Sequence, residues 1–346
     1  MTPFKTAIVG CGKIFPMHAT SVRLSEMAEL VAVCDIKEDR AKKAAQEYNC
    51  RYYTDYDQML KEADIDVVQI CTPHNTHAPL TIAAAKAGKH VLTEKPMSIS
   101  VEDARAMIET CEENGVTLGV IFQNRYNPGS QLIKSALEDG SLGQVLGGKC
   151  SVTWKRTDDY YSKSDWKGTW AQEGGGVLID QAIHTMDLLR WFVGDEIEYV
   201  DAQMGNRAHE RIEVEDSVEG VVKYRNGVFT GFYAINYYSY DAPVEIELHC
   251  VKGTAKMVAD RATITYNDGT VITRDKNPND TIDYGEGVKI YWGVSHSKQI
   301  RAFYQSLATG EKPFIDGREA FKTQEMIASI YRSAKEGKRV YLAKSE

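Results

Sequence analysis

A short apolar segment at the start of the chain runs directly into a glycine-rich turn. Residues 6–9 are predicted to form a strand, Gly10-Cys11-Gly12 follows it, and Pro16 suits the first turn of a helix that reaches about Leu24. A turn of this kind lets backbone N–H groups approach a pyrophosphate, and the helix N-terminus adds partial positive charge. The chain is therefore expected to begin with the first unit of a doubly wound sheet.

The alternation of strands and helices continues to residue 123. Further strands are predicted at 29–34, 67–71, 90–94 and 117–123, with helices at 38–48, 76–87 and 100–114. The segment 67–71 (VVQIC) is a continuous apolar run, which is typical of a strand buried on both faces. Strands that alternate with helices form right-handed βαβ units around a parallel sheet. The fold class predicted for residues 1–123 is an α/β Rossmann domain.

After residue 124 the pattern changes. Helices are predicted at about 130–139 and 178–193, a strand-like stretch at 145–156, and several strands separated by turns within 198–274. The polar segment 275–292 is expected to be a long loop, and helices follow at about 296–309 and 317–336. Strands joined by turns, without helices between them, favour an antiparallel sheet. We therefore predict a second, α+β domain over 124–346, whose last helices are candidates for packing on the first domain.

Composition excludes several classes of partner. The net charge is −8, whereas nucleic-acid-binding proteins usually carry a basic stripe, so no nucleic acid is expected as a partner. The seven cysteines contain no C-x-x-C pair, which favours reduced thiols over a disulfide framework or a zinc site. No segment reaches the length of a transmembrane helix, and the first residues lack the long apolar run of a signal peptide. We expect a cytoplasmic protein without a membrane partner.

Asp35 strengthens the prediction of a dinucleotide site at the glycine-rich turn. It ends the second predicted strand, about where an acidic residue binds the ribose hydroxyls of a dinucleotide. Its carboxylate would repel a 2′-phosphate, so NAD is expected in preference to NADP, although Lys37 nearby keeps NADP as the alternative. Phe15 departs from the usual pattern, which has glycine or alanine there. Gly-x-Gly alone also fits an ordinary tight turn, but the flanking strand and helix favour a cofactor site.

The candidate cofactor site extends along the carboxyl edge of the predicted parallel sheet, where ligands of doubly wound sheets bind. Residues 72–77 follow the strand at 67–71, and a solvated loop is the alternative for them. The candidate cofactor contacts are Gly10, Gly12, Lys13, Ile14, Asp35, Thr72, Pro73, Asn75, His77, Glu94 and Lys95.

Lys95 follows the strand at 90–94, which would deliver it to this same edge. Taken alone, a Glu-Lys pair before a proline is more often a surface ion pair or a turn.

A second group of candidate residues lies in the segment 174–187 (GGGVLIDQAIHTMD). The glycines permit close backbone approach, and Asp180 and His184 are four residues apart, which places them on one face of a helix. Asp187 is an alternative partner for His184. A structural hydrogen bond is the alternative to a catalytic pair. No metal is expected, because no Cys or further His accompanies the pair.

Four segments together resemble the Gfo/Idh/MocA oxidoreductases, a family named for glucose-fructose oxidoreductase and inositol dehydrogenase. They are GCGKIF with His18 after it, CTPHNTH at 71–77, TEKP at 93–96 and GGGVLIDQAIHTMDLLRWFVG at 174–194. The resemblance covers almost the whole chain in the same order. It implies an NAD-binding Rossmann domain joined to a domain with a large, mostly antiparallel open sheet, which binds substrate and mediates oligomerisation.

The resemblance also implies residue roles. Lys95 matches the lysine of the family's EKP motif, and Asp180 and His184 match its D-x-x-x-H pair. By that match, His184 takes the proton of a secondary hydroxyl as general base and Asp180 orients or polarises it. Lys95 would then hydrogen-bond the developing alkoxide. The family pattern further suggests a cis peptide bond before Pro96. The expected catalytic set is Lys95, Asp180 and His184.

Aromatic and polar residues crowd the segment 154–170, just before the glycines. Exposed rings beside polar groups suit a sugar, since rings stack on its apolar face and polar groups bind its hydroxyls. The evenly weighted alternative is that Trp154, Trp166 and Trp170 anchor a loop or an oligomer interface. The candidate substrate contacts are Arg125, Tyr160, Trp170, Asp180 and His184.

An aromatic-rich strand at 229–240 is expected to face a second subunit, because the broad sheets of the family associate face to face. The resemblance thus implies a homodimer or homotetramer formed through the sheet.

The leading hypothesis is an NAD-dependent dehydrogenase that oxidises a secondary hydroxyl of a sugar, sugar derivative or cyclitol, or reduces the keto form. A redox-assisted glycosidase or epimerase, which oxidises its sugar transiently, would use the same residues and stays an alternative. A non-catalytic regulator that senses NAD and sugar is a third interpretation. Retention of Lys95, Asp180 and His184 argues against it.

Overall fold

The computed structural model describes residues 2–194, 196–285, 288 and 294–344. The chain divides into two compact units. The first combines Met1–Gln123 with Pro278–Lys322, and the second combines Asn124–Asn277 with Thr323–Glu346. Helix α9 (Ser295–Thr309) therefore belongs to the unit of the N-terminal sheet. The division of tasks between a cofactor domain and a substrate domain stays a prediction.

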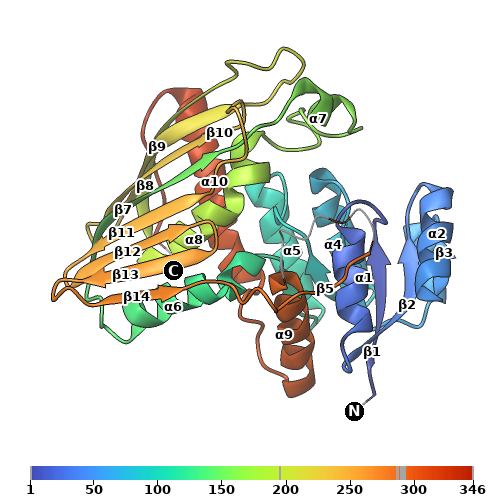
Figure 1. The fold of residues 1–346 in the computed structure, drawn as a ribbon. Helices are drawn as coiled ribbons and strands as arrows, with labels where there is room; N and C mark the ends of the chain where they lie inside the picture. Colours follow the sequence, from blue (N-terminus) through green and yellow to red (C-terminus); the bar gives the residue numbers. More distant parts are fainter. Residues whose placement is uncertain (1, 195, 286–287, 289–293, 345–346) are drawn as a thin grey trace. The chain divides into compact units, whose positions relative to one another are not determined.

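The first unit contains a six-stranded, wholly parallel sheet in the order β3-β2-β1-β4-β5-β6 (Figure 1). Its strands are β1 Phe4–Val9, β2 Ala28–Cys34, β3 Arg51–Tyr53, β4 Val67–Ile70, β5 His90–Thr93 and β6 Leu118–Val120. The helices between them are α1 Phe15–Arg23, α2 Glu38–Tyr48, α3 Tyr56–Glu62, α4 His77–Lys86 and α5 Val101–Glu113. This arrangement confirms the predicted Rossmann fold. It also adds β3 and α3, two short elements that the apolar pattern did not indicate.

Helix α9 belongs to this unit because its apolar side chains form part of the unit's core. Phe303 and Tyr304 of α9 pack with Val22 of α1 and with Val67 and Leu92 of the sheet. All of these side chains are buried, and burying large apolar side chains is the main favourable contribution to folding. Strand order reverses between β1 and β4, so the turns that follow these two strands meet at the switch point of the sheet.

The second unit contains a nine-stranded mixed sheet in the order β14-β13-β12-β11-β7-β10-β9-β8-β15. All neighbouring strands are antiparallel except β7 and β10, so the predicted, mostly antiparallel sheet is confirmed. The strands are β7 Val145–Thr153, β8 Ile197–Gly205, β9 Ser217–Tyr224, β10 Phe229–Ile235, β11 Glu245–Cys250, β12 Gly253–Val258, β13 Arg261–Tyr266, β14 Val271–Arg274 and β15 Val340–Tyr341.

Helices cover one face of this sheet. Helix α6 (Pro128–Glu138) packs on β12 to β14, and α8 (Ile183–Val193) packs on β7 and β11. In α10 (Gly317–Glu336), Ser333 accepts a hydrogen bond from the backbone of β8. Along β12, buried and exposed side chains alternate, as expected of a sheet with one covered face.

The predicted helix at 178–193 is divided in two. Residues Val177–Ala182 form a π-helical turn, and the α-helix begins only at Ile183. The short helix α7 (Asp158–Ser162) lies before it in the chain. Of the loop predicted at 275–292, residues 286–287 and 289–292 lie outside the described residues.

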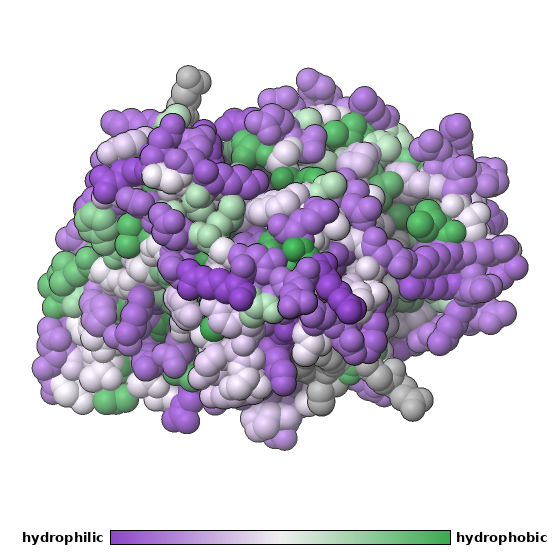
Figure 2. All heavy atoms as spheres, turned by 90° about the horizontal axis from the view of Figure 1, so that it is seen from above, coloured by the Kyte–Doolittle hydropathy of each residue, from purple (hydrophilic) through white to green (hydrophobic). Residues whose placement is uncertain are grey.

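On the face drawn in Figure 2, hydrophilic side chains cover most of the surface and apolar ones form separate patches. Among the described residues, none of the helices combines the length and apolarity that crossing a membrane requires.

Candidate active site

Gly10 is required where the glycine-rich turn passes the end of β4. Its φ is +91°, and a Cβ atom added there would lie 2.6 Å from the carbonyl oxygen of Cys71. Gly12 has open space around the corresponding position, which leaves its backbone accessible. The two glycines therefore serve different ends, close packing at the switch point and access for a ligand.

The Asp35 carboxylate is tied to this turn. Its two oxygens accept hydrogen bonds from the backbone N–H groups of Cys11 and Lys37, each at 2.8 Å. An ionised carboxylate has lone pairs left for hydroxyl donors. The next side chain, Ile36, is apolar and 88% exposed, which suits packing against a flat ring such as the base of a nucleotide. The sequence pattern alone does not single out Ile36. Together with the accessible backbone at Gly12, these groups fit the pyrophosphate and an unmodified ribose of a dinucleotide.

Phe15, which replaces the expected third glycine, has a packing role. Its buried ring meets Tyr48 of α2 edge-on, with ring centroids 5.5 Å apart. It joins Ile8, Val33 and Ala44 in a buried cluster, so the departure from the usual pattern fills the space between α1, α2 and the sheet. Of the remaining candidates in this turn, Lys13 is exposed and Ile14 is half-buried at the start of α1.

His77 holds two loops together instead of offering its ring to a ligand. Its Nδ1 lies 2.7 Å from the carbonyl oxygen of Pro96 and its Nε2 lies 2.9 Å from that of Thr72. The side chain is 1% exposed, and burial lowers its pKa. Both ring nitrogens face backbone carbonyls, which favours a structural role for His77 over the predicted cofactor contact. Pro73 and Asn75 stay candidates in the loop that His77 fixes.

Glu94 is buried, in contrast to the surface ion pair that its motif allowed. Its carboxylate accepts hydrogen bonds from Nε2 of His18 at 2.9 Å and from the backbone N–H of Lys95 at 3.2 Å, and Nε2 of His296 lies 3.3 Å away. Nδ1 of His18 lies 2.6 Å from the amide oxygen of Gln69. This polar cluster is joined to Lys95 through Glu94, whose carboxylate accepts the Lys95 backbone N–H. Its other members, His18, Gln69 and His296, lie far from Lys95 in the sequence and could not be found from it.

Glu94 and His18 each stabilise the charged form of the other. Burial alone would raise the pKa of Glu94, but His18 and His296 hold it well below its ordinary value. Burial alone would lower the pKa of His18, but Cys71 and Glu94 raise it well above its ordinary value. A carboxylate and an imidazolium therefore face each other beside Lys95, which is half-buried. The Lys95–Pro96 peptide bond is cis, as the family pattern suggested.

In the second unit, two of the three glycines before Asp180 admit neighbouring groups. A Cβ at Gly175 would lie 2.0 Å from the hydroxyl of Tyr331, and one at Gly176 would lie 1.9 Å from the carbonyl oxygen of Glu215. The Glu215 carboxylate accepts hydrogen bonds from the backbone N–H groups of Gly176 and Leu178 and from Tyr331. Burial raises the pKa of Glu215 to about 7. These contacts hold the first turn of the π-helix.

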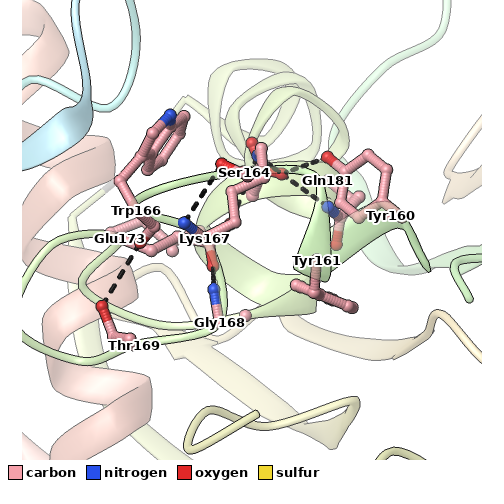
Figure 3. A network of polar contacts seen from close by, with 12 residues as sticks. Tyr160, Tyr161, Ser164, Trp166, Lys167, Gly168, Thr169, Glu173 and Gln181 are labelled. Atoms are coloured by element: carbon pink, nitrogen blue, oxygen red, sulfur yellow. Dashed lines mark hydrogen bonds and ion pairs between the residues drawn. The ribbon is translucent and has the colours of Figure 1, made fainter. Parts of the chain in front are cut away.

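Asp180 lies in this π-helical turn and is the acceptor of a dense polar cluster that includes Tyr160, Lys167 and Gln181, which are labelled in Figure 3. Its Oδ2 accepts hydrogen bonds from the hydroxyl of Tyr160 at 3.0 Å, from the amide of Gln181 at 2.6 Å and from the ammonium group of Lys167. Tyr160, expected to touch substrate, is thus bonded directly to the candidate catalytic carboxylate. Lys167 was missed because it lies in a loop thirteen residues earlier, and nothing in its local pattern marks it.

His184 lies in the first turn of α8 and is half-buried. The expectation that it shares one regular α-helical face with Asp180 needs correction, since Asp180 precedes the α-helix in a wider turn. Single π-helical turns of this kind are frequent at functional sites.

Arg125 and Asp187 form a buried ion pair. Nε and Nη2 of Arg125 donate to the two carboxylate oxygens at 2.8 and 2.6 Å, and Thr323 donates to one of them at 2.7 Å. Asp187 is therefore taken up by Arg125 and is not the partner foreseen for His184. Arg125 has no exposed surface and its guanidinium lies over the ring of Trp191, which favours a structural role over the predicted substrate contact.

Two tryptophans of the segment 154–170, Trp154 and Trp170, are bonded to the backbone of other loops. The indole N–H of Trp170 donates to the carbonyl of Glu213 at 2.9 Å, and its ring meets Tyr331 edge-on. The indole N–H of Trp154 donates to the carbonyl of Ala242 at 3.1 Å. These contacts match the loop-anchor alternative. Within the described residues, no group of three His, Cys, Asp or Glu side chains is placed to hold a metal ion.

Each of the two units contains a segment that matches the model of a known protein family. Residues 4–122 match the model of an oxidoreductase family with an NAD-binding Rossmann fold. Residues 130–256 match the model of the GFO/IDH/MocA C-terminal domain.

Individual relatives align over nearly the whole chain. D-apiose dehydrogenase of Paraburkholderia graminis is 30% identical over 99% of this chain and 91% of its own length. Myo-inositol 2-dehydrogenase of Thermotoga maritima is 27% identical, with 91% of each chain covered. Among solved structures, the WlbA dehydrogenase of Bordetella pertussis in complex with NADH and UDP-GlcNAcA is 30% identical. It covers 99% of both chains with a TM-score of 0.87.

Proposed function

This chain belongs to the Gfo/Idh/MocA oxidoreductases, NAD(P)-dependent enzymes acting on CH–OH groups, and from that premise we propose that it is an NAD-dependent dehydrogenase. The proposed reaction oxidises a secondary hydroxyl of a sugar, sugar derivative or cyclitol, or reduces the keto form. The observation that carries the proposal is Lys95 at the end of β5, in the same unit as the dinucleotide turn, with Asp180 and His184 retained in the other unit.

The cofactor would be held by groups of the first unit. The accessible backbone at Gly12 and the N-terminus of α1 suit the pyrophosphate, and Asp35 suits the ribose hydroxyls. Because a 2′-phosphate would meet the Asp35 carboxylate, NAD is favoured over NADP. When bound, NAD supplies a hydride acceptor.

The protein's own groups would manage the proton and the developing charge. His184, whose ordinary pKa lies near neutrality, would accept the hydroxyl proton as general base. The Lys95 ammonium group would donate a hydrogen bond to the oxygen as negative charge develops on it. Asp180 would orient the reacting groups through its carboxylate. In the reductive direction His184 returns the proton.

A polyhydroxylated substrate is supported by two observations. The cluster around Asp180 offers ammonium, phenol, amide and carboxylate groups within a small region, and such groups bind hydroxyls. Relatives are named for apiose and for myo-inositol, both rich in hydroxyl groups. Tyr160 is the substrate contact that we retain with Asp180 and His184. For Trp170, the loop-anchor role accounts for its contacts.

The uncovered face of the nine-stranded sheet is the proposed oligomer interface. It carries Val221, Phe229, Tyr233 and Val258, all partly exposed apolar side chains on the side away from α6 and α8. Exposed apolar patches of this kind often mark protein–protein contacts. We propose a homodimer or homotetramer formed through this face.

Variants of the catalytic set test the proposal. Lys95→Ala and His184→Ala should each lower kcat/KM by about 100-fold or more, as expected when a proton-transferring or charge-stabilising group is lost. NADH binding, measured by nucleotide fluorescence, should change little in His184→Ala. The matched control is Lys322→Ala, at an exposed lysine of α10 that pairs with Glu319. Wild-type turnover in both catalytic variants would reject the assignment.

A further inference from the structure

The ammonium group of Lys167 lies between two carboxylates from different segments of the chain. Nζ donates to Oδ2 of Asp180 and to Oε1 of Glu173, the latter at 3.3 Å. The side chain of Lys167 is 15% exposed and that of Glu173 is fully buried. A charge removed from water this far is tolerated only when partners compensate it. The chain has therefore built a specific place for this cation.

Aromatic rings fix the position of the ammonium group. The ring centroid of Trp166 lies 4.4 Å from Nζ, and that of Tyr160 lies 5.2 Å from it. The Tyr160 hydroxyl donates to the same oxygen of Asp180 that receives Lys167. Figure 3 shows these side chains converging from the 160–173 segment on the π-helical turn. The Lys167 ammonium group and the Tyr160 hydroxyl thus hold the same oxygen of the Asp180 carboxylate in one orientation.

Glu173 anchors Lys167 from the opposite side. One of its oxygens accepts the backbone N–H of Gly168, and the other faces the ammonium group. Burial, with a smaller contribution from the nearby Asp180 charge, raises the pKa of Glu173 to about 8.

Other charged or titratable groups also surround Asp180. They are Arg156, which pairs with Asp241, together with Tyr160, Tyr161 and, four residues along the chain, His184. The pKa values of Tyr160 and Tyr161 are raised, above all by burial, so both phenols stay neutral at physiological pH. Among the charged groups around Asp180, Lys167 forms an ion pair directly with the Asp180 carboxylate.

We propose that Lys167 is a positioning residue for the reaction, whose ammonium group fixes the charge and direction of the Asp180 carboxylate. This inference rests on the proposed function, which makes Asp180 part of the catalytic set. With Lys167 in place, Asp180 stays ionised and acts as a hydrogen-bond acceptor for the reacting groups, and His184 carries the proton. The role requires no contact between Lys167 and substrate.

The test compares Lys167→Gln, which keeps an N–H donor but loses the charge, with Lys167→Arg, which keeps the charge. An ionised carboxylate is harder to maintain without its cation, so the acidic limb of the kcat/KM–pH profile should move upward by about 1 pH unit or more in Lys167→Gln. Its kcat should fall about tenfold. Lys167→Arg should keep the limb near its wild-type position. Lys163→Gln, at an exposed lysine paired with Asp159, is the matched control and should match wild type.

The outcomes separate this inference from the proposed function. If Lys167→Gln does not fold, as judged by circular dichroism, Lys167→Met is combined with Glu173→Gln. The double variant should fold more readily because the buried acid Glu173, which would lose its cation, is removed as well. An unmoved acidic limb with wild-type kcat in the folded variant overturns the inference, and so does an equal shift in Lys167→Arg. If Lys95→Ala and His184→Ala lose turnover while the Lys167 variants keep it, only the positioning role fails. If the former two keep turnover, the proposed function itself fails.

Discussion

At the scale of single residues, short-range patterns were enough to place the dinucleotide turn. Gly10 and Asp35 could be predicted because a strand, a turn and the next strand's end lie within about thirty residues of sequence. Lys167 and Glu173 could not, since only the folding of a loop brings them to Asp180. The burial of Arg125 could not be predicted for the same reason, because nothing local shows that an arginine will pair with an aspartate 62 residues later.

Gly10 gives a prediction at this scale. Gly10→Ala combines a positive φ with a contact of 2.6 Å to the Cys71 carbonyl, which is backbone and cannot move aside cheaply. The free energy of unfolding should fall by about 2–4 kcal/mol, as measured by denaturant titration.

Gly88→Ala is the control for that experiment. Gly88 has φ +72° but open space around its Cβ position, so only the backbone cost of about 1 kcal/mol applies. Equal losses in the two variants would show that close packing at the switch point contributes nothing.

At the scale of helices and strands, hydrophobic patterning predicted most of both sheets. It failed where an element is short or depends on distant groups. Strand β3 has three residues, two of them exposed, and gives no apolar run. The π-helical turn of 177–182 looks like ordinary helix in sequence. Its first N–H groups are bonded by Glu215, which lies more than thirty residues further along the chain.

The uncovered face of the nine-stranded sheet carries the prediction at this scale. Light scattering at micromolar concentration should give the mass of a dimer or a tetramer. Phe229→Asp replaces one of the exposed apolar side chains of this face with a charge, so it should shift the protein toward monomer. Val251→Asp, an exposed substitution in the turn after β11, should not. A monomeric wild type would contradict the proposed interface.

At the scale of the whole molecule, the family membership settles a class of chemistry but not the substrate. The same catalytic set would serve simple dehydrogenation or a transient oxidation followed by elimination, so sequence patterns cannot separate these reactions. They differ in whether reduced cofactor accumulates. A regulator without chemistry would show binding of cofactor and sugar but no hydride transfer at all.

The most direct test of the central claim is therefore cofactor reduction by the wild-type protein. A panel of sugars, sugar derivatives and cyclitols is incubated with NAD⁺ or NADP⁺, and absorbance at about 340 nm is followed. We predict steady formation of NADH with at least one polyhydroxylated substrate, and a higher kcat/KM with NAD⁺ than with NADP⁺ because of Asp35. Aglycone release or epimerisation without net NADH, or no reduction with any member of the panel while NADH and sugar still bind, would contradict the proposed dehydrogenase.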